Sequence, residues 1–489
     1  MQLSFGPVYA AILLTLDICI RIVAVVIVPV NRKPQTATAW LLAIMTIPTI
    51  GFVLFLLFGS NKLPRKRRAR QRQINQYITE STEKLGSLDR GGHWPEWLEP
   101  IVELNRSLGA MPIVGGNTAK LFPNYDESLA AMTDAVNKAK RYVHAEFYII
   151  AFDRTTVPFF EALHDAVQRG VTVRVLLDHV ASWRSPHYFR TIRKLRRIGV
   201  KWQLMLPIQP WRGRIQRVDL RNHRKLLVID GEVAYTGSQN MIDRSYNKRS
   251  NRRRGLKWKD LMVRFEGPIV PGIDALFITD WYSETDELLE NETIVPEQAS
   301  PPDILDMLDC QVVPSGPGFE GENNLRLFNS LLYSAQEKII ITSPYFVPDE
   351  SMLYAITTAA QSGLDVQLFV SEIGDQPVVY HAQRSYYEAL LRAGVRIWLY
   401  KAPTVLHAKH FTIDDRVAVI GSSNMDMRSF TLNLEISVMI HGPEFVSQLR
   451  EVEASYRAMS RELTLDDWRK QPLRSKVLDN VARLTATVQ

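Results

Sequence analysis

Residues 222–240 read NHRKLLVIDGEVAYTGSQN, and residues 406–424 read LHAKHFTIDDRVAVIGSSN. Both segments follow the pattern His-x-Lys-x4-Asp-x6-Gly-Ser-x-Asn, and the second begins 184 residues after the first. A solvated strand face would explain a single His-x-Lys, but the full pattern at equal spacing twice indicates an internal duplication. The shared residues are His223, Lys225, Asp230, Gly237, Ser238 and Asn240, then His407, Lys409, Asp414, Gly421, Ser422 and Asn424.

The duplication extends beyond these motifs. Strand-like runs alternate with amphipathic segments in the same order in both halves, from YVHAEFYII (142–150) to LMVRFEGP (261–268) and from KIIITSPYF (338–346) to LEISVMIHGP (434–443). This alternation predicts two α/β domains, each with a largely parallel or mixed sheet. The stretch EQASPPD (297–303) predicts a linker, so we expect the domains at 116–296 and 304–489.

Composition narrows the class of protein. A chain of 489 residues is too long for one compact core, and its formal net charge of +7 comes from clustered basic residues. Such clusters suit polyanions or an anionic membrane surface. The two cysteines, Cys19 and Cys310, have neither disulfide-framework nor zinc-ligand spacing, which favours a reducing compartment.

Two apolar runs, residues 8–30 and 36–58, open the chain. At 1.5 Å per residue each could cross a hydrocarbon core of about 30 Å. A cleavable signal peptide fits poorly because no basic segment precedes the first run. Two buried core helices fit poorly because both runs are long and nearly free of charge. We therefore expect residues 1–60 to form a hairpin of two transmembrane helices.

Charged residues orient this hairpin. Asp17 and Arg21, four apart in the first run, would share a helix face and pair towards the second helix, with substrate handling as the alternative. Only Arg32 and Lys33 lie between the runs, whereas seven basic residues follow the second. The positive-inside rule then places both termini and everything after residue 60, the helical connector 61–115 and the catalytic domains included, in the cytoplasm. There these basic residues could also contact anionic headgroups. The seven are Lys62, Arg65, Lys66, Arg67, Arg68, Arg70 and Arg72.

The motif residues suit phosphate chemistry. His and Lys two apart on a strand project from the same face, and the returning Gly-Ser-x-Asn segment can bring a hydroxyl and an amide beside them. An imidazole, an ammonium, a hydroxyl and an amide would form a pocket of phosphate size. Asp230 and Asp414 each follow a strand-like segment, LLVI (226–229) or HFTI (410–413), and are expected to fix turns rather than contact substrate.

The doubled motif resembles the signature of the phospholipase D superfamily, and the resemblance covers roughly residues 115–485. The segment 31–59 and VVPSGP (312–317) look like those of bacterial cardiolipin synthases, which implies the bacterial inner membrane. In that family the two units pack face to face and line one active site. Two imidazoles are needed because one attacks phosphorus while the other protonates the leaving alkoxide and deprotonates the incoming alcohol.

Carried over by motif position, the resemblance assigns roles. His223 would be the nucleophile and His407 the general acid/base, although the symmetry of the motifs cannot itself decide between them. Lys225, Lys409, Asn240 and Asn424 would hold phosphate oxygens, supported by Ser238 and Ser422. Glu435 stands 28 residues after His407, where a histidine-orienting carboxylate is expected. Asp260, 37 residues after His223, is the candidate in the first copy.

The longer spacing in the first copy comes from a basic insertion, predicted either as a solvated loop or as a funnel for anionic headgroups. Its basic residues are Arg244, Lys248, Arg249, Arg252, Arg253, Arg254, Lys257 and Lys259. No metal or other cofactor is expected, because lysines supply the positive charge.

The resemblance implies a transphosphatidylase that converts two phosphatidylglycerols into cardiolipin and glycerol. Its expected partners are these two lipids and an anionic membrane surface, without nucleic acid. A hydrolase that uses water as acceptor would share every catalytic residue. A nuclease would have little use for a membrane hairpin, and a catalytically silent scaffold would not need two complete motifs. The range of acceptors and the oligomeric state are left open.

Overall fold

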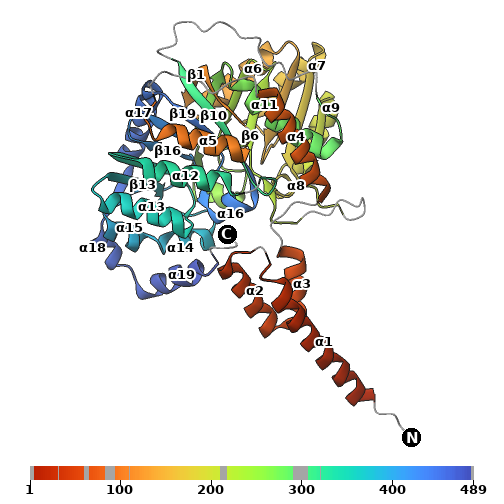
Figure 1. Cartoon of the computed structure of the whole chain (residues 1–489). Helices are drawn as coiled ribbons and strands as arrows, with labels where there is room; N and C mark the ends of the chain where they lie inside the picture. Colours follow the sequence, from red (N-terminus) through yellow and green to blue (C-terminus); the bar gives the residue numbers. More distant parts are fainter. Residues whose placement is uncertain are drawn as a thin grey trace. The chain divides into compact units, whose positions relative to one another are not determined.

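The computed structural model describes residues 5–30, 32–59, 65–82, 94–109, 111–209, 217–289, 307–319 and 321–485. Two compact units are distinguished, one containing residues 1–62 with 217–219 and the other containing the rest of the chain (Figure 1). The linker 297–303, both domain limits beside it and Lys62 lie outside the described residues.

The first unit contains three helices, α1 (Phe5–Ile27), α2 (Pro34–Thr46) and α3 (Pro48–Phe58). Only α1 is long and apolar enough to cross a membrane among the described residues. The second apolar run, expected as one helix, is divided at Ile47 because Pro48 has no N–H to continue the ladder. A Cβ added at Gly51 would lie 2.8 Å from the Ala43 carbonyl oxygen, so α3 folds back against α2.

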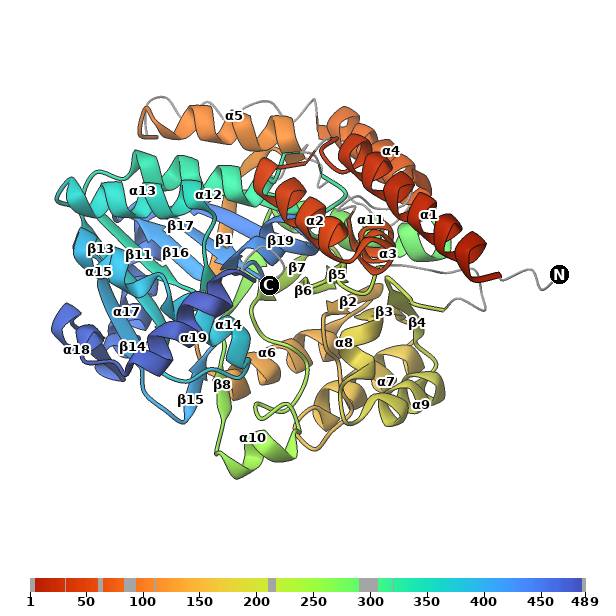
Figure 2. The ribbon, with the colours of Figure 1, turned by 90° about the horizontal axis from the view of Figure 1, so that it is seen from below.

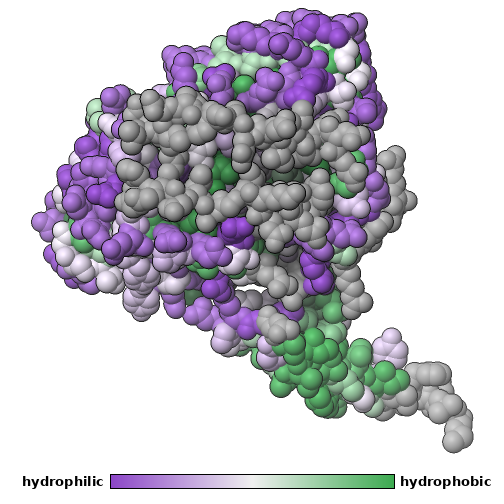
Figure 3. Space-filling view, turned by 45° about the horizontal axis from the view of Figure 1, so that its top comes forward, coloured by the Kyte–Doolittle hydropathy of each residue, from purple (hydrophilic) through white to green (hydrophobic). Residues whose placement is uncertain are grey.

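Two arginines stabilise this folded-back pair. Arg21 Nε donates to Asp17 Oδ2 at 2.9 Å, as expected, and Arg21 Nη1 donates to the Met45 carbonyl at 2.8 Å, at the last turn of α2. Arg32 Nε donates to the Gly59 carbonyl at 2.9 Å, which ties the end of α3 to the loop before α2. The chain therefore reverses direction near Met45, between α2 and α3. The end of α3 then lies close to the loop that joins α1 to α2. Apolar side chains dominate its surface (Figure 3).

The second unit contains both copies of the α/β repeat, preceded by α4 (Arg65–Thr82) and α5 (Leu98–Gly109). The first copy contains β1 (Ile113–Phe122), α6 (Tyr125–Lys138), β2 (Tyr142–Phe147), α7 (Val157–Gln168), β3 (Thr172–Asp178), α8 (His179–Trp183), α9 (Tyr188–Ile198), β4 (Lys201–Met205), β5 (Arg221–Asn222), β6 (Lys225–Ile229), β7 (Val233–Gly237), α10 (Arg249–Arg253), β8 (Lys257–Lys259), β9 (Met262–Glu266) and α11 (Val270–Thr285).

The second copy repeats the order of the main strands and helices, with further short elements inside it and at its end. It contains β10 (Leu308–Ser315), α12 (Asn323–Ser334), β11 (Lys338–Thr342), β12 (Phe346–Val347), α13 (Glu350–Gln361), β13 (Asp365–Ser371), α14 (Pro377–Arg384), α15 (Tyr387–Ala393), β14 (Arg396–Tyr400), β15 (Thr404–Leu406), β16 (His410–Ile413), β17 (Val417–Gly421), β18 (Met425–Asp426), α16 (Met427–Thr431), β19 (Asn433–His441), α17 (Pro443–Ala458), β20 (Ser460–Leu463), α18 (Leu465–Arg469) and α19 (Leu473–Arg483).

One mixed sheet runs through both copies, in the order β20-β14-β13-β11-β16-β17-β19-β10-β1-β9-β7-β6-β2-β3-β4. The copies meet where β1 pairs antiparallel with β10, with Ile113 opposite Gln311. The face-to-face packing implied by the family resemblance is therefore not observed, because the two half-sheets join edge to edge. Strand order on either side of this joint is the same, which gives the unit a pseudo-twofold arrangement (Figure 2).

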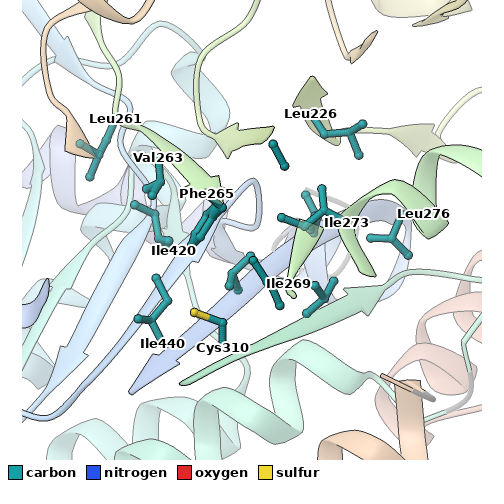
Figure 4. Close-up of a cluster of buried hydrophobic side chains, with 14 of the residues drawn as sticks. Leu226, Leu261, Val263, Phe265, Ile269, Ile273, Leu276, Cys310, Ile420 and Ile440 are labelled. Atoms are coloured by element: carbon teal, nitrogen blue, oxygen red, sulfur yellow. The ribbon is translucent and has the colours of Figure 1, made fainter. Parts of the chain in front are cut away.

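The central part of one sheet face is covered by α11 and α17, whose apolar side chains share one buried cluster with both copies. Phe265 and Ile273 of the first copy contact this cluster together with Cys310, Ile420 and Ile440 of the second (Figure 4). The opposite face is covered by α6, α7 and α9 in the first copy and by α12, α13 and α15 in the second. A shared core explains why the two copies form one compact unit.

The connector expected at 61–115 divides between the copies. Arg67 Nη2 lies 2.7 Å from Glu284 Oε2, and Arg70 Nη1 donates to the Ser283 carbonyl, so α4 packs on α11 of the first copy. The apolar face of α5, with Leu98 and Ile101, joins the core of the second copy. Part of the basic run is therefore engaged in contacts within the protein.

Candidate active site

Short strand pairs between the copies position the two histidines. In the first copy β5 pairs in parallel with β19, and the His223 N–H donates to the Leu434 carbonyl at 2.8 Å. In the second copy β15 pairs in parallel with β8, and the His407 N–H donates to the Lys259 carbonyl at 2.8 Å. Each motif histidine therefore stands beside the other copy, His223 beside the start of β19 and His407 beside the end of β8.

This register joins each histidine to a carboxylate of the other copy. His223 Nδ1 lies 2.9 Å from Glu435 Oε1, and His407 Nδ1 lies 2.7 Å from Asp260 Oδ1. Glu435 and Asp260 thus contact motif histidines, but the expectation that each serves the histidine of its own copy is wrong. Because Nδ1 faces the carboxylate, Nε2 is left as the reactive nitrogen of each ring.

The motif serines hold these carboxylates. The Ser238 hydroxyl donates to Asp260 Oδ1 at 2.7 Å, and the Ser422 hydroxyl donates to Glu435 Oε2 at 2.5 Å. Each hydroxyl also accepts a backbone N–H, from Leu261 or from Ile436, so both serines have protein partners as donor and as acceptor. The serines, predicted to bind phosphate, contact the carboxylates of the histidine–carboxylate pairs in this structure.

The glycine before each serine permits this contact. A Cβ at Gly421 would lie 2.8 Å from the Ser437 Cα, and one at Gly237 would lie 3.0 Å from the Met262 Cα. Backbone atoms that close exclude any larger residue. The Gly-Ser pair of the motif is thus explained by the need to bring a hydroxyl against the neighbouring strand.

Both lysines are buried beside their histidines. Lys225 Nζ donates to the His223 carbonyl, and Lys409 Nζ donates to the His407 carbonyl at 2.7 Å. Burial lowers the pKa of Lys409 to about 8 and holds the pKa of Lys225 well below its usual value. An anion that entered the site would favour the charged form of both side chains.

Burial also governs the histidines. It lowers the pKa of His223 to about 4 against the opposing effect of Glu435, and the pKa of His407 to about 4 together with Lys409. Burial alone would raise the pKa values of Asp260 and Glu435, but their histidines and the lysines hold them below the usual range. At neutral pH the site therefore contains two neutral imidazoles and two carboxylates.

The motif asparagines differ from each other. Asn240 accepts from the Ile149 N–H at 3.1 Å and donates to the Tyr246 hydroxyl at 2.8 Å. Asn424 is buried, and its side-chain oxygen has no hydrogen-bond partner among the described residues. The amide of Asn424 is therefore the freer of the two to contact a ligand.

The motif aspartates lie in turns, as expected. Asp230 accepts the N–H groups of Lys140, Arg141 and Tyr142. Asp414 does the same for Gln336, Glu337 and Lys338 in the second copy. Both aspartates have left-handed backbone conformations, with φ of 56° and 50°. These contacts fix the loop before β2 or β11, and so the geometry assigns the aspartates a structural role.

The basic insertion forms α10 and the flanking turns. Most of its basic side chains are exposed, although Arg252 donates to Asn247 and Arg254 to the Gly374 carbonyl. Its last residues form β8, which leads to Asp260. The insertion thus places exposed positive charge next to the strand that orients His407. Within the described residues, no group of three His, Cys, Asp or Glu side chains gathers as metal ligands would.

Two further groups were not predicted from the sequence. The ring of Tyr148 stands edge-on to His223 with centroids 4.8 Å apart, and burial raises the Tyr148 pKa to about 12. Beneath His223, Arg224 pairs with Asp280 in the first copy, where the second copy has Ala408. The sequence did contain a signal for this ion pair, because Arg224 lies between His223 and Lys225. Strand alternation directs its side chain into the core, where a charged group needs a partner.

Comparisons with known proteins agree with this geometry. The family model described as "Cardiolipin synthase, PLD-like domain" matches residues 132–262 and 328–455, and "Phospholipase_D-nuclease N-terminal" matches 18–60. Cardiolipin synthase A of Proteus mirabilis is 34% identical over 92% of both chains. A cardiolipin synthase of Geobacillus kaustophilus is 32% identical over 94% of this chain and 90% of its own.

Among solved structures, the phosphatidylserine synthase of Haemophilus influenzae Rd KW20 superposes with a TM-score of 0.60 at 14% identity. The match covers 79% of this chain and 99% of the other, and supports the fold alone. The fold and the paired motifs define an enzyme of the phospholipase D superfamily that transfers phosphatidyl groups between phospholipids. Within that class, the chain belongs to the cardiolipin synthase family.

Proposed function

We propose that the protein makes cardiolipin from two molecules of phosphatidylglycerol at the inner face of a bacterial cell membrane. The observation that carries this proposal is the pair of buried imidazoles, each held at Nδ1 by a carboxylate of the other copy. Two oriented Nε2 atoms provide one nucleophile and one proton carrier, which are the groups a double displacement at phosphorus needs.

In the first step His223 Nε2 attacks the phosphorus of one phosphatidylglycerol. The bond between phosphorus and the glycerol headgroup oxygen breaks, and that oxygen takes a proton from His407. Protonation of His407 is favoured once the anionic phosphodiester occupies the site, because a nearby negative charge raises the imidazole pKa. Lys225, Lys409 and the Asn424 amide stabilise charge on the non-bridging oxygens.

In the second step a hydroxyl of another phosphatidylglycerol gives its proton to neutral His407 and attacks the phosphorus of the phosphohistidine. The bond between phosphorus and nitrogen breaks, which releases cardiolipin and restores His223. Exposed basic residues of the insertion 244–259 attract the anionic headgroups.

The anchor supports a membrane location with the catalytic unit in the cytoplasm. At 1.5 Å per residue, α1 is about 35 Å long, whereas α2 and α3 are about 20 and 16 Å. We therefore propose that α1 crosses the bilayer and that the α2–α3 pair enters and leaves on the cytoplasmic side, in place of the multi-pass hairpin predicted from the sequence. This arrangement places Arg32, Lys33 and the basic run of α4 together in the cytoplasm.

Reconstitution tests the reaction. The purified full chain in phosphatidylglycerol vesicles, without nucleotide or divalent metal, should release one glycerol for each cardiolipin formed. His223→Ala in the same vesicles is the control for contaminating activity. Phosphatidic acid as the main product would instead identify a hydrolase.

A further inference from the structure

The C-terminal helix α19 carries its aliphatic side chains on the outside of the protein. Leu473, Val477, Val481 and Leu484 are 77%, 52%, 56% and 82% exposed. Their spacing of four, four and three residues places them on one helix face. A helix at the surface of a water-soluble domain normally turns such a face inward. In α19 the aliphatic face points outward instead.

The inward side of α19 is polar and firmly held. Asp479 is buried, with His381 Nδ1 2.6 Å and Arg384 Nε 3.2 Å from its Oδ1. Ser475 Oγ accepts from Arg384 at 3.1 Å. The partners belong to α14, so ion pairs with α14 fix which face of α19 points outward. Rotation of α19 to bury its leucines and valines would leave Asp479 without its partners.

Positive charge surrounds the exposed aliphatic face. Asp479 is the only acidic residue of α19, and it is buried. An aliphatic face flanked by basic residues, with no exposed acid on the same helix, is typical of helices that lie in the interface of an anionic bilayer. The exposed basic residues of α19 are Arg474 and Arg483, whereas Arg469 and Lys470 just before it lie 3.6 Å from Asp466 and 3.4 Å from Asp467.

The helix that holds α19 also borders the active site. The side-chain oxygen of Gln383, in α14, accepts from the Phe346 N–H at 2.9 Å. Phe346 begins β12, which pairs with β18 directly after Asn424. Arg254 of the basic insertion donates a hydrogen bond to the Gly374 carbonyl, in the loop before α14. Figures 1 and 2 show α14 and α19 side by side within the second copy.

We propose that α19 is an interfacial helix that inserts its aliphatic face into the surface of an anionic bilayer and seats the rim of the active site there. The proposal rests on the membrane-lipid substrate proposed above. It makes α19 a lipid contact additional to the anchor of residues 5–59, which holds the chain in the membrane but does not orient the catalytic rim through α19.

A fluorescence experiment tests the contact without relying on activity. Val477→Cys in the full chain with Cys19→Ser would carry a bimane label, and Cys310 is buried. In phosphatidylglycerol vesicles the label should shift to the blue and be quenched by nitroxide lipids rather than by iodide. The matched control is Tyr354→Cys on α13, which is also exposed and should stay accessible to iodide. Quenching of both labels by iodide alone would overturn the proposal.

A functional experiment separates this inference from the reaction itself. Leu473→Gln, Val477→Gln and Val481→Gln together should lower cardiolipin formation in vesicles several-fold while leaving turnover of monomeric short-chain phosphatidylglycerol unchanged. Tyr333→Gln with Tyr354→Gln removes exposed aromatic groups elsewhere and should change neither rate. Equal rates for the triple variant and the parent in vesicles would contradict the interfacial role. The label at residue 477 could also be shielded from iodide in detergent as strongly as in vesicles. If the detergent particle then contained two chains, the exposed face of α19 would be a contact with a second copy instead.

Discussion

At the scale of single residues, the site depends on which nitrogen of each imidazole faces the substrate. Glu435 and Asp260 occupy Nδ1 of His223 and His407, and each carboxylate is itself held by a motif serine. The serines are therefore linked to the imidazoles through these carboxylates. This arrangement explains why the motif contains Gly-Ser in addition to its histidine and lysine.

Each histidine and the carboxylate of the other copy form what we call a crossed pair, Glu435 with His223 and Asp260 with His407. The crossed pairs predict different kinetic defects when the two carboxylates are replaced. With a phosphatidyl donor that releases p-nitrophenol, the first step needs no proton from His407. Asp260→Asn should therefore keep the burst of p-nitrophenolate but lose about 10²-fold or more with phosphatidylglycerol, whose alkoxide must be protonated. Glu435→Gln should lose the burst, because it weakens the nucleophile. Stopped-flow absorbance measures both.

Histidine variants provide the controls. After incubation with the activated donor, His407→Ala should show a phosphatidyl group on His223 by mass spectrometry, and His223→Ala should show none. If each carboxylate served its own copy, Glu435→Gln would keep the burst and Asp260→Asn would lose it. An adduct on His407 in the His223→Ala protein would reverse the assignment of nucleophile and acid.

At the scale of elements, the sequence predicted some features and missed others for physical reasons. The strands, the helices and the doubled motif followed from periodicity and spacing, which are local. The exchange of carboxylates depends on the register of the short pairs β5–β19 and β15–β8, which no spacing within one copy encodes. The break at Pro48 was visible, but membrane helices tolerate proline, so an apolar run alone did not reveal that α3 folds back.

The folded-back pair predicts the sidedness of two positions. In a Cys19→Ser chain, a cysteine inserted before α1 should react with a membrane-impermeant maleimide added outside intact cells. Lys33→Cys should be protected until the cells are opened, because it shares the cytoplasmic side with α4. A continuous two-span hairpin would give the opposite result at both positions, with the terminus protected and residue 33 labelled.

At the scale of the whole molecule, both copies are needed for either half of the reaction. The sheet is continuous through β1 and β10, α11 and α17 share one core, and each histidine depends on a carboxylate across the joint. Helix α5 adds to this dependence, since it precedes the first copy and packs in the core of the second. Neither copy is therefore an independent catalytic module.

Division of the chain tests this dependence. Residues 1–296 and 297–489, produced separately, should each form no cardiolipin, because each would contain one histidine without its carboxylate. Produced together, with a tag on one piece, they should copurify and recover activity, and His223→Ala in the first piece should abolish it. Cardiolipin formation by either piece alone would show that a histidine can work with groups of its own copy.

The crossed pairs also bear on how such a protein could arise. A gene for one copy encodes a histidine and a carboxylate that cannot reach each other, so an ancestor with one copy could work only as a symmetric homodimer, with β1 of each subunit pairing across the twofold axis. Fusion of two such genes would remove the symmetry requirement. The two copies could then accumulate separate changes, which two identical subunits of a homodimer cannot do. Such differences are Asp260 in the place of Glu435, Arg224 in the place of Ala408, and the basic insertion in the first copy.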